Sequence, residues 1–442
     1  MSSNAAIDLN KLIDEAPIGV YRLAIFVVCG LIALIDGFDT QSIAFAAPAI
    51  AAEWVVPTSL FGVVFGAGLI GGTVGAILLG SAGDRFGRRQ ILLATIIIFA
   101  AMSFATAHSH SIQALVFWRF MTGMGLGGAV PSIIAIASEY APRRLRATVI
   151  TCTFCNFPLG AVLGGVASAR LLDQFGWRSI FLLGAVAPLL LLPIVFLLIP
   201  ESISMLVAKQ RLADLVVLVR RIDPQHAYPS DTQFLFPGHS QERVGLRELL
   251  RTDLRTGTLL LWLGSFTSLL LAYFLINWTP LLLRQSGMAM SHAIYAVVLL
   301  NLGSIIGSIV LSQLGDRFGL GYVVPPAFVA GALAIVFVST SATSPVMVMI
   351  AVFLAGMFCV GSQVVSIALI AIYYPSRLCA TGVGWTMGVG RIGSIVGPGG
   401  AGLLVAGGLG APQIFLTATI PALIAAAAVF GVGAMLRRQA TT

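Results

Sequence analysis

One short segment occurs twice in this chain, 232 residues apart. Residues 71–87 and 303–319 share two glycines of an apolar run and the whole Gly-Asp-Arg-Phe-Gly ending. A second pair, residues 140–148 and 373–381, repeats the pattern Tyr-x-Pro-x-Arg-Leu-x-Ala-Thr at an offset of 233 residues. Because an internal repeat constrains a fold before any local propensity does, we predict that the chain is built from two copies of one unit.

The composition indicates that this unit lies in a membrane. Hydrophobic residues make up 58% of the chain and charged residues only 10%, whereas globular domains carry about 25% charged residues. Apolar stretches of about 20 residues, the length that spans a bilayer, can be placed twelve times. The predicted spans are 22–47, 59–80, 90–108, 113–138, 146–172, 177–199, 257–283, 291–312, 322–340, 345–372, 378–404 and 412–436. We therefore predict an all-α integral membrane protein with twelve transmembrane helices in two six-helix pseudo-repeats.

The distribution of Lys and Arg predicts the orientation of these spans. If both termini are cytoplasmic, 20 of the 25 Lys and Arg residues lie in inside segments and only Arg170, Arg178 and Arg284 lie outside. The net charge of +8 reflects this bias and gives no argument for a nucleic-acid partner. The predicted regions are a cytoplasmic segment 1–21, a six-helix bundle 22–199, a cytoplasmic loop 200–256, a second bundle 257–436 and a cytoplasmic tail 437–442.

The glycines of the repeated segment predict close helix packing, because small residues let helices approach each other where lipid gives no hydrophobic drive. The Asp-Arg pair that ends each copy lies at the cytoplasmic end of span 2 or span 8. Such a carboxylate can pair with arginines or a helix N-terminus across the two halves, and the contact must break when that side opens. The alternative is a simple turn with positive-inside charges. The candidate gating residues are Gly80, Asp84, Arg85, Arg88, Asp316 and Arg317.

Four charged residues lie within predicted spans and are not repeated: Asp36, Asp39, Arg119 and Arg391. Charge inside a bilayer is costly, so each is a functional candidate by default. Asp36 and Asp39 share one helix face about a turn apart, and one of them should hold a proton near neutral pH. They are candidate proton carriers, with Glu139 as a third. In the alternative interpretation both aspartates are structural partners of Arg119.

Arg391 lies between Gly390 and Gly393, and no acidic residue is predicted at its depth in the second half. A buried guanidinium needs an anion, and a carboxylate of a substrate fits its fork. The competing interpretation pairs Arg391 with Asp36 or Asp39 across a cavity. Further candidate substrate-binding residues, chosen for aromatic or amide character, are Tyr273, Asn277, Gln363 and Trp385.

Three motifs resemble those of the major facilitator superfamily. The segment Gly80-x-x-x-Asp84-Arg85-x-Gly87-Arg88-Arg89 is similar to the loop between spans 2 and 3 of that superfamily. Arg119-x-x-x-Gly123-x-Gly125 in span 4 and Pro200-Glu201-Ser202 after span 6 resemble two others. This similarity covers the whole chain and implies a transporter with no enzymatic activity, no metal site and no cofactor.

Within the superfamily the chain resembles the aromatic acid/proton symporter family. The matching segments are Asp36-Gly37-Phe38-Asp39, Ser138-Glu139-Tyr140 and the run from Ala380-Thr381-Gly382 to Gly390-Arg391. The resemblance implies proton-driven uptake of a benzoate-like carboxylate into a bacterium that degrades it, by a monomer in the inner membrane. It also implies that Arg119, with Arg391, belongs to the substrate-binding set.

One position departs from that family, which has an arginine directly before Ala-Thr-Gly of span 11 where this chain has Cys379. The internal repeat shows this departure independently, because the matching position of the first copy holds an arginine, Arg146. Substrate identity therefore stays open. Another organic acid, such as muconate, a dicarboxylate or a sugar acid, and efflux are the alternatives within transport, and a membrane receptor or channel is the alternative outside it.

Overall fold

The computed structural model describes residues 7–223, 234–235, 246–251, 254–340 and 344–441. Within these ranges, twelve helices are long and apolar enough to cross a membrane, which confirms the predicted all-α fold of two six-helix halves. The first half consists of α2 (Val20–Trp54), α3 (Phe61–Phe86), α4 (Arg88–Ala107), α5 (Ile112–Tyr140), α6 (Arg146–Phe175) and α7 (Arg178–Leu198).

The second half repeats this arrangement. Its helices are α11 (Arg255–Gln285), α12 (Met290–Phe318), α13 (Leu320–Thr340), α14 (Pro345–Ala355) with α15 (Gly361–Tyr373), α16 (Ser376–Ala406), and α17 (Ala411–Thr417) with α18 (Thr419–Thr441). A π-helical turn over Gly356–Val360 joins α14 to α15 within one span. The surface of both halves carries exposed leucines, among them Leu190 and Leu403, as expected where the neighbouring medium is lipid.

The repeated glycines allow close helix contacts in both halves. A methyl group on Gly75 of α3 would lie 2.0 Å from the Met124 carbonyl oxygen of α5, and one on Gly307 of α12 would lie 2.1 Å from that of Met357. A second matched pair lies on α6 and α16, where Gly160 and Gly393 touch the carbonyls of Leu34 and Phe266. No side chain fits at these crossings, so the helices of each bundle approach backbone to backbone.

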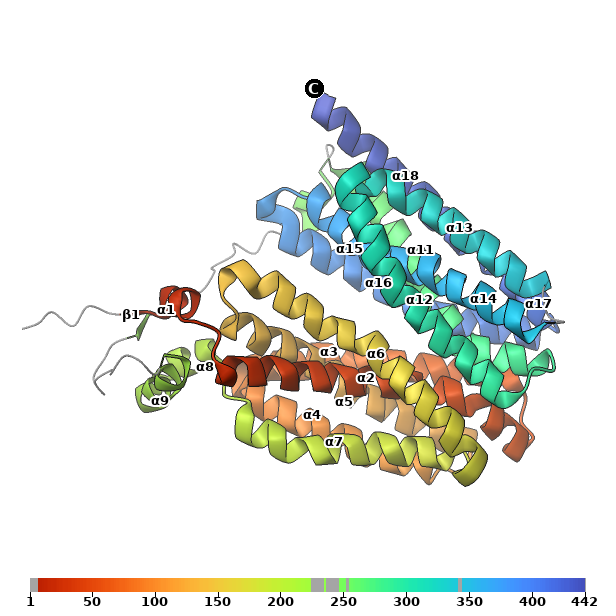
Figure 1. Cartoon of the computed structure of the whole chain (residues 1–442), viewed down its shortest axis with the longest axis horizontal. Coiled ribbons are helices and arrows are strands. Elements are labelled where there is room, and N and C mark those ends of the chain that lie inside the picture. The colour runs from red at the N-terminus through yellow and green to blue at the C-terminus, as the bar shows by residue number, and fades with distance from the viewer. Residues whose placement is uncertain (1–6, 224–233, 236–245, 252–253, 341–343, 442) are drawn as a thin grey trace, which may run out of the picture.

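The two bundles meet at one end and diverge at the other (Figure 1). At the joined end Gly62 of α3 lies against Gly402 of α16, and Gly165 of α6 lies against Val298 of α12. At the diverging end lie the short elements α1 (Leu9–Glu15), α8 (Ile203–Ala208) and α9 (Leu212–Ile222), all on the first bundle. We call the end where the bundles meet the closed end, and the end where they diverge the open end.

The short elements are fastened to the open end of the first bundle. The buried Arg22 guanidinium donates hydrogen bonds to the backbone carbonyls of Tyr140, Ala16 and Ile13, which ties α1 to α2 and α5. Two residues of β1 (Ile7–Asp8) pair in parallel with β2 (Phe234–Leu235), which follows α9. One further turn, α10 (Leu246–Leu249), precedes the second bundle. The described part of the central region thus contains three short helices and one short strand.

Candidate functional site

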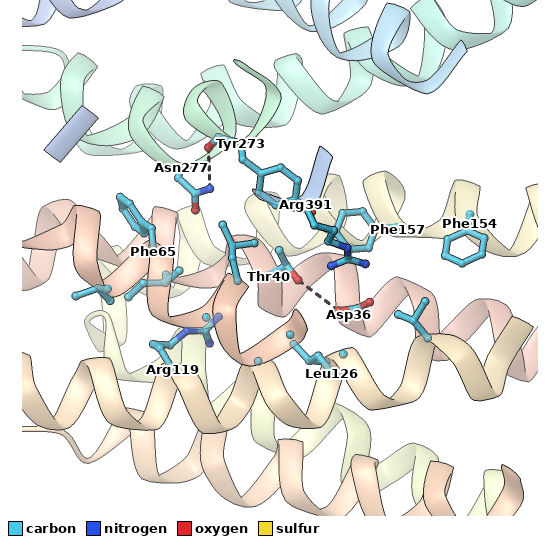
Figure 2. Close-up of a pocket in the computed structure, with 18 residues that line it drawn as sticks. Asp36, Thr40, Phe65, Arg119, Leu126, Phe154, Phe157, Tyr273, Asn277 and Arg391 are labelled. Atoms are coloured by element: carbon cyan, nitrogen blue, oxygen red, sulfur yellow. Dashed lines mark hydrogen bonds between the residues drawn. The ribbon is translucent and has the colours of Figure 1, made fainter. Parts of the chain in front are cut away.

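A cavity of about 240 Å³ lies between the bundles and is lined by five of the predicted polar residues, Arg119 among them, with Thr40 (Figure 2). Asp36 and Thr40 come from α2, Tyr273 and Asn277 from α11, and Arg391 from α16. For scale, an apolar cavity of about 150 Å³ holds a benzene molecule. The cavity therefore has room for one substituted ring.

Asp39 is fully engaged with Arg119 and does not face the cavity. Nη1 of Arg119 donates to Oδ2 of Asp39 at 3.0 Å, and Nη2 donates to the Asp39 backbone carbonyl at 3.1 Å. The Ser103 hydroxyl donates to the other carboxylate oxygen at 3.1 Å. The two charged side chains are 0% and 3% exposed, so this is a buried ion pair with further hydrogen bonds.

Asp36 has a different environment, although it lies one turn from Asp39. Its one described hydrogen bond comes from the Thr40 hydroxyl, at 3.3 Å. Arg391 faces it across the cavity with an exposed guanidinium, and within the described residues that guanidinium makes no hydrogen bond or salt bridge (Figure 2). The structure thus pairs Arg119 with one aspartate and leaves the other opposite a free cation.

Gly37 explains how α2 brings Asp36 so close to α6. A methyl group at Gly37 would lie 1.8 Å from the Phe157 carbonyl oxygen, so only glycine permits this helix crossing. The same crossing places the rings of Phe154 and Phe157 on the cavity wall, with Phe65 of α3 on another side. These three rings were not among the predicted site residues, and among 26 phenylalanines no local pattern distinguishes them.

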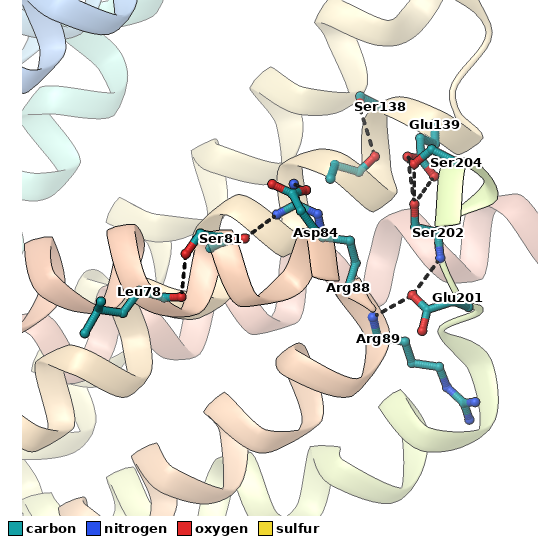
Figure 3. Close-up of polar contacts among 12 residues, drawn as sticks. Leu78, Ser81, Asp84, Arg88, Arg89, Ser138, Glu139, Glu201, Ser202 and Ser204 are labelled. Carbon is teal, nitrogen blue, oxygen red and sulfur yellow. Dashed lines mark hydrogen bonds and ion pairs between the residues drawn. The ribbon is translucent and has the colours of Figure 1, made fainter. Parts of the chain in front are cut away.

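Besides Asp39, three predicted substrate-binding or proton-coupling residues lie away from the cavity. Gln363 lines a separate small pocket with Ser265 and Ser268, and Trp385 packs near Trp262 with a ring distance of 6.3 Å. Glu139 lies at the open end, where its carboxylate accepts hydrogen bonds from the hydroxyls of Ser202 and Ser204 and from the backbone N–H of Ile203 (Figure 3). It caps the start of α8. A proton-coupling role for Glu139, and substrate contacts for Gln363 and Trp385, stay predictions.

The predicted gating residues also lie at the open end. Arg88 forms an ion pair with Asp84 one turn away and donates to the Gly80 carbonyl at 3.4 Å (Figure 3). The Glu201 carboxylate accepts the backbone N–H of Arg89 at 3.1 Å, at the start of α4. Glu201 belongs to the third motif, so two of the sequence motifs meet here.

In the second bundle the matching residues Asp316 and Arg317 are exposed, and Arg317 lies over the Phe318 ring at 5.2 Å. Within the described residues these two Asp-Arg segments make no hydrogen bond or ion pair across the bundles. Cys379, the departure from the family pattern, has its thiol 3.7 Å from the Ala371 carbonyl. A latch between the halves stays a prediction for the conformation in which this end is closed.

The arrangement can bind a small anion and exchange a proton. The Arg391 guanidinium supplies a fork of donors for a carboxylate, and the phenyl rings beside it supply apolar and aromatic contact. The Asp36 carboxylate is the group that can take up a proton, because no cation holds it in a salt bridge. A guanidinium from the second bundle therefore meets phenyl rings and a carboxylate from the first bundle in one cavity.

The chain is similar in sequence to several known proteins. The family model described as "Major Facilitator Superfamily" matches residues 29–341 and 261–440. The chain is 34% identical to the 4-hydroxybenzoate transporter PcaK of Acinetobacter baylyi, over 97% of this chain and 95% of that protein. It is 35% identical to a gallate transporter of Pseudomonas putida, over 97% and 96%.

A solved structure of a bacterial homolog of the human lysosomal transporter Spinster, inward-facing and unoccupied, superposes with a TM-score of 0.74. It is 18% identical, covers 96% of this chain and 99% of its own, and shows the fold alone. The family model and the two relatives confirm the superfamily that the three sequence motifs predicted.

Proposed function

The chain belongs to the major facilitator superfamily, and we propose that it imports an aromatic monocarboxylate, benzoate- or hydroxybenzoate-like, by proton symport through alternating access. The observation that carries this proposal is the free Arg391 guanidinium facing Asp36 across a phenyl-lined cavity. The printed names of the relatives, which specify 4-hydroxybenzoate and gallate, support the same class of cargo. The resemblance to the aromatic acid/proton symporter family supports it as well.

Substrate and proton are coupled through the charge on Asp36. An ionised Asp36 competes with a bound carboxylate for the field of Arg391 and repels it, whereas a protonated Asp36 does neither. Proton and anion therefore favour each other's binding, and this coupling is reciprocal by linkage. A proton gradient then drives accumulation of the acid with no other cofactor.

Asp39 and Arg119 have a separate role in this scheme. Their ion pair joins α2 to α5, and the two opposite charges neutralise each other. Of the two span-1 aspartates, Asp36 is therefore the proton carrier, and Asp39 holds its helix in place. Arg119 also lines the cavity, and its buried Nε has no hydrogen-bond partner within the described residues.

The positive-inside bias of Lys and Arg supports an orientation in which the open end faces the cytoplasm of a bacterial cell and the protein lies in the inner membrane. A cavity lined by residues of one chain supports a monomer as the functional unit.

Uptake of labelled aromatic acids by cells that express the protein tests the proposal. Benzoate, 4-hydroxybenzoate, gallate and a dicarboxylate such as muconate are compared with and without an uncoupler. We expect accumulation of at least one aromatic monocarboxylate that the uncoupler abolishes. Arg391→Gln keeps a polar side chain that can donate hydrogen bonds but removes the cation, and it should lose accumulation of every acid in the panel. Uncoupler-resistant accumulation, or uptake of the muconate alone, would contradict the mechanism or the substrate class respectively.

A further inference from the structure

A reciprocal pair of amides joins the two bundles beside the cavity. Nε2 of Gln41 on α2 donates to Oδ1 of Asn301 on α12 at 3.0 Å, and Nδ2 of Asn301 donates to Oε1 of Gln41 at 2.8 Å. Asn301 donates its second N–H to the Val297 carbonyl at 2.9 Å. Both side chains are buried, at 0% and 3% exposure. We call this contact the amide pair.

The amide pair stands out from its surroundings at the closed end. The neighbouring contacts between bundles involve glycine or apolar groups, such as Gly62 with Gly402. A second hydrogen bond between the bundles joins Nε2 of Gln285 to Oγ1 of Thr58 at 2.7 Å, but that bond is exposed. An exposed bond exchanges readily with water and contributes little, whereas a buried amide without a partner costs about 1–3 kcal/mol. Loss of one partner of the amide pair therefore costs free energy, whereas loss of the exposed bond costs little.

Its position connects it to the transport cycle. Gln41 lies about one and a half helical turns from Asp36, toward the closed end. Asn301 lies on the helix of the second bundle that carries the repeated glycines. For the cavity to open at the end that is now closed, α2 and α12 must separate, so each cycle breaks these two bonds. In the separated state water can hydrate both amides.

We propose that the amide pair holds the closed end shut and sets the balance between the two access states. While it is formed, both amides are satisfied without water and the cavity opens toward α1, α8 and α9. If one partner becomes apolar, the other amide is stranded only in the state that closes this end. If both become apolar, neither is stranded, and the closed end is a dry apolar contact.

If the amide pair acts in this way, the single and double variants should shift the access equilibrium in opposite senses, which a loss of packing alone does not give. Gln41→Leu and Asn301→Leu should each shift the population toward the state that is open at the other end, by about fivefold or more. The double variant should return to within about twofold of the wild type, or move beyond it toward the closed arrangement. Gln285→Leu removes the exposed bond and serves as the matched control, with no shift.

The populations can be measured by pulsed electron paramagnetic resonance in a cysteine-free background. Spin labels at Val55→Cys and Leu403→Cys, exposed sites at the closed ends of α2 and α16, report separation of the bundles as a longer distance. The measurement is made in lipid nanodiscs without substrate. It therefore depends only on exchange between two states and not on which acid is carried.

Long-distance populations in both single variants and a return in the double variant would support the proposal. Unchanged distances in the single variants, or a double variant with the summed shift of the two, would overturn it. If a leucine variant is not recovered folded, Gln41→Asn with and without Asn301→Gln gives the same test with amides retained. There the single change should shift the population, and the compensated pair should restore it; failure to restore would refute the role.

Discussion

Removing the carboxylate of Asp36 should separate substrate binding from the proton gradient. Asp36→Asn keeps the size of the side chain and its contact with Thr40 but is permanently neutral. A sphere of 240 Å³ has a diameter of about 8 Å, so a carboxylate on Arg391 lies within about that distance of Asp36. At an effective dielectric constant of about 20, two like charges at that separation repel by about 2 kcal/mol. Ionised Asp36 should thus weaken anion binding by about thirtyfold.

Calorimetric titration of the purified protein with its acid, repeated across a range of pH, measures this effect. The wild-type affinity should fall as the pH rises, because Asp36 loses the proton that favours the anion. Asp36→Asn should bind with the high affinity at every pH, exchange labelled substrate in counterflow, and fail to accumulate it against a gradient. Equal pH dependence in the two proteins, or uncoupler-sensitive accumulation by the variant, would refute the assignment of the proton to Asp36.

Three further changes test other parts of the structure. Asp39→Asn should lower the stability by about 3–5 kcal/mol, seen as a lower melting temperature in detergent, because it strands the buried Arg119; the double change Asp39→Leu with Arg119→Met should recover most of that loss. Gly75→Ala should destabilise the first bundle by about 1–3 kcal/mol, whereas Gly66→Ala, with nothing within 4 Å of the added methyl group, should not. Asp84→Asn should slow counterflow exchange without changing substrate affinity, and normal exchange rates would argue against a gating role.

The fold was predictable because its determinants are repeated and apolar. Glycine spacing and hydropathy indicated twelve spans, and the part of the chain that the structure describes contains twelve such helices. The helix ends were less predictable: α2 continues to Trp54, although the apolar stretch was predicted to end at residue 47. Glu53 lies in that extension, and its carboxylate accepts bonds from Trp177 and Arg178 at 2.7 and 2.8 Å. A tertiary contact between helices thus stabilises a polar helix end that hydropathy alone assigns to a loop.

The candidate site was predictable where a polar group stands in an apolar span. Asp36 and Arg391 were identified in this way, and both line the cavity. The different environments of Asp36 and Asp39 were not predictable, because residues three apart on a helix differ by about 60° in direction. That rotation turns Asp39 toward α5 and leaves Asp36 in the cavity. Gln363 shows the converse limit, since an amide in a span can also face a small pocket within its own bundle.

The repeat also shows how a symmetric scaffold gives an asymmetric site. At the offset that aligns Leu34 with Phe266, Gln41 aligns with Tyr273, and Asn301 aligns with Leu69. Gln41 and Asn301 bond to each other and close one crossing between the bundles, whereas Tyr273 and Leu69 both line the cavity. Equivalent positions therefore hold the bundles together on one side and leave space on the other. Because the backbone crossings are the same in both halves, side chains alone make this difference, and substitutions at the amide pair should alter access without altering the fold.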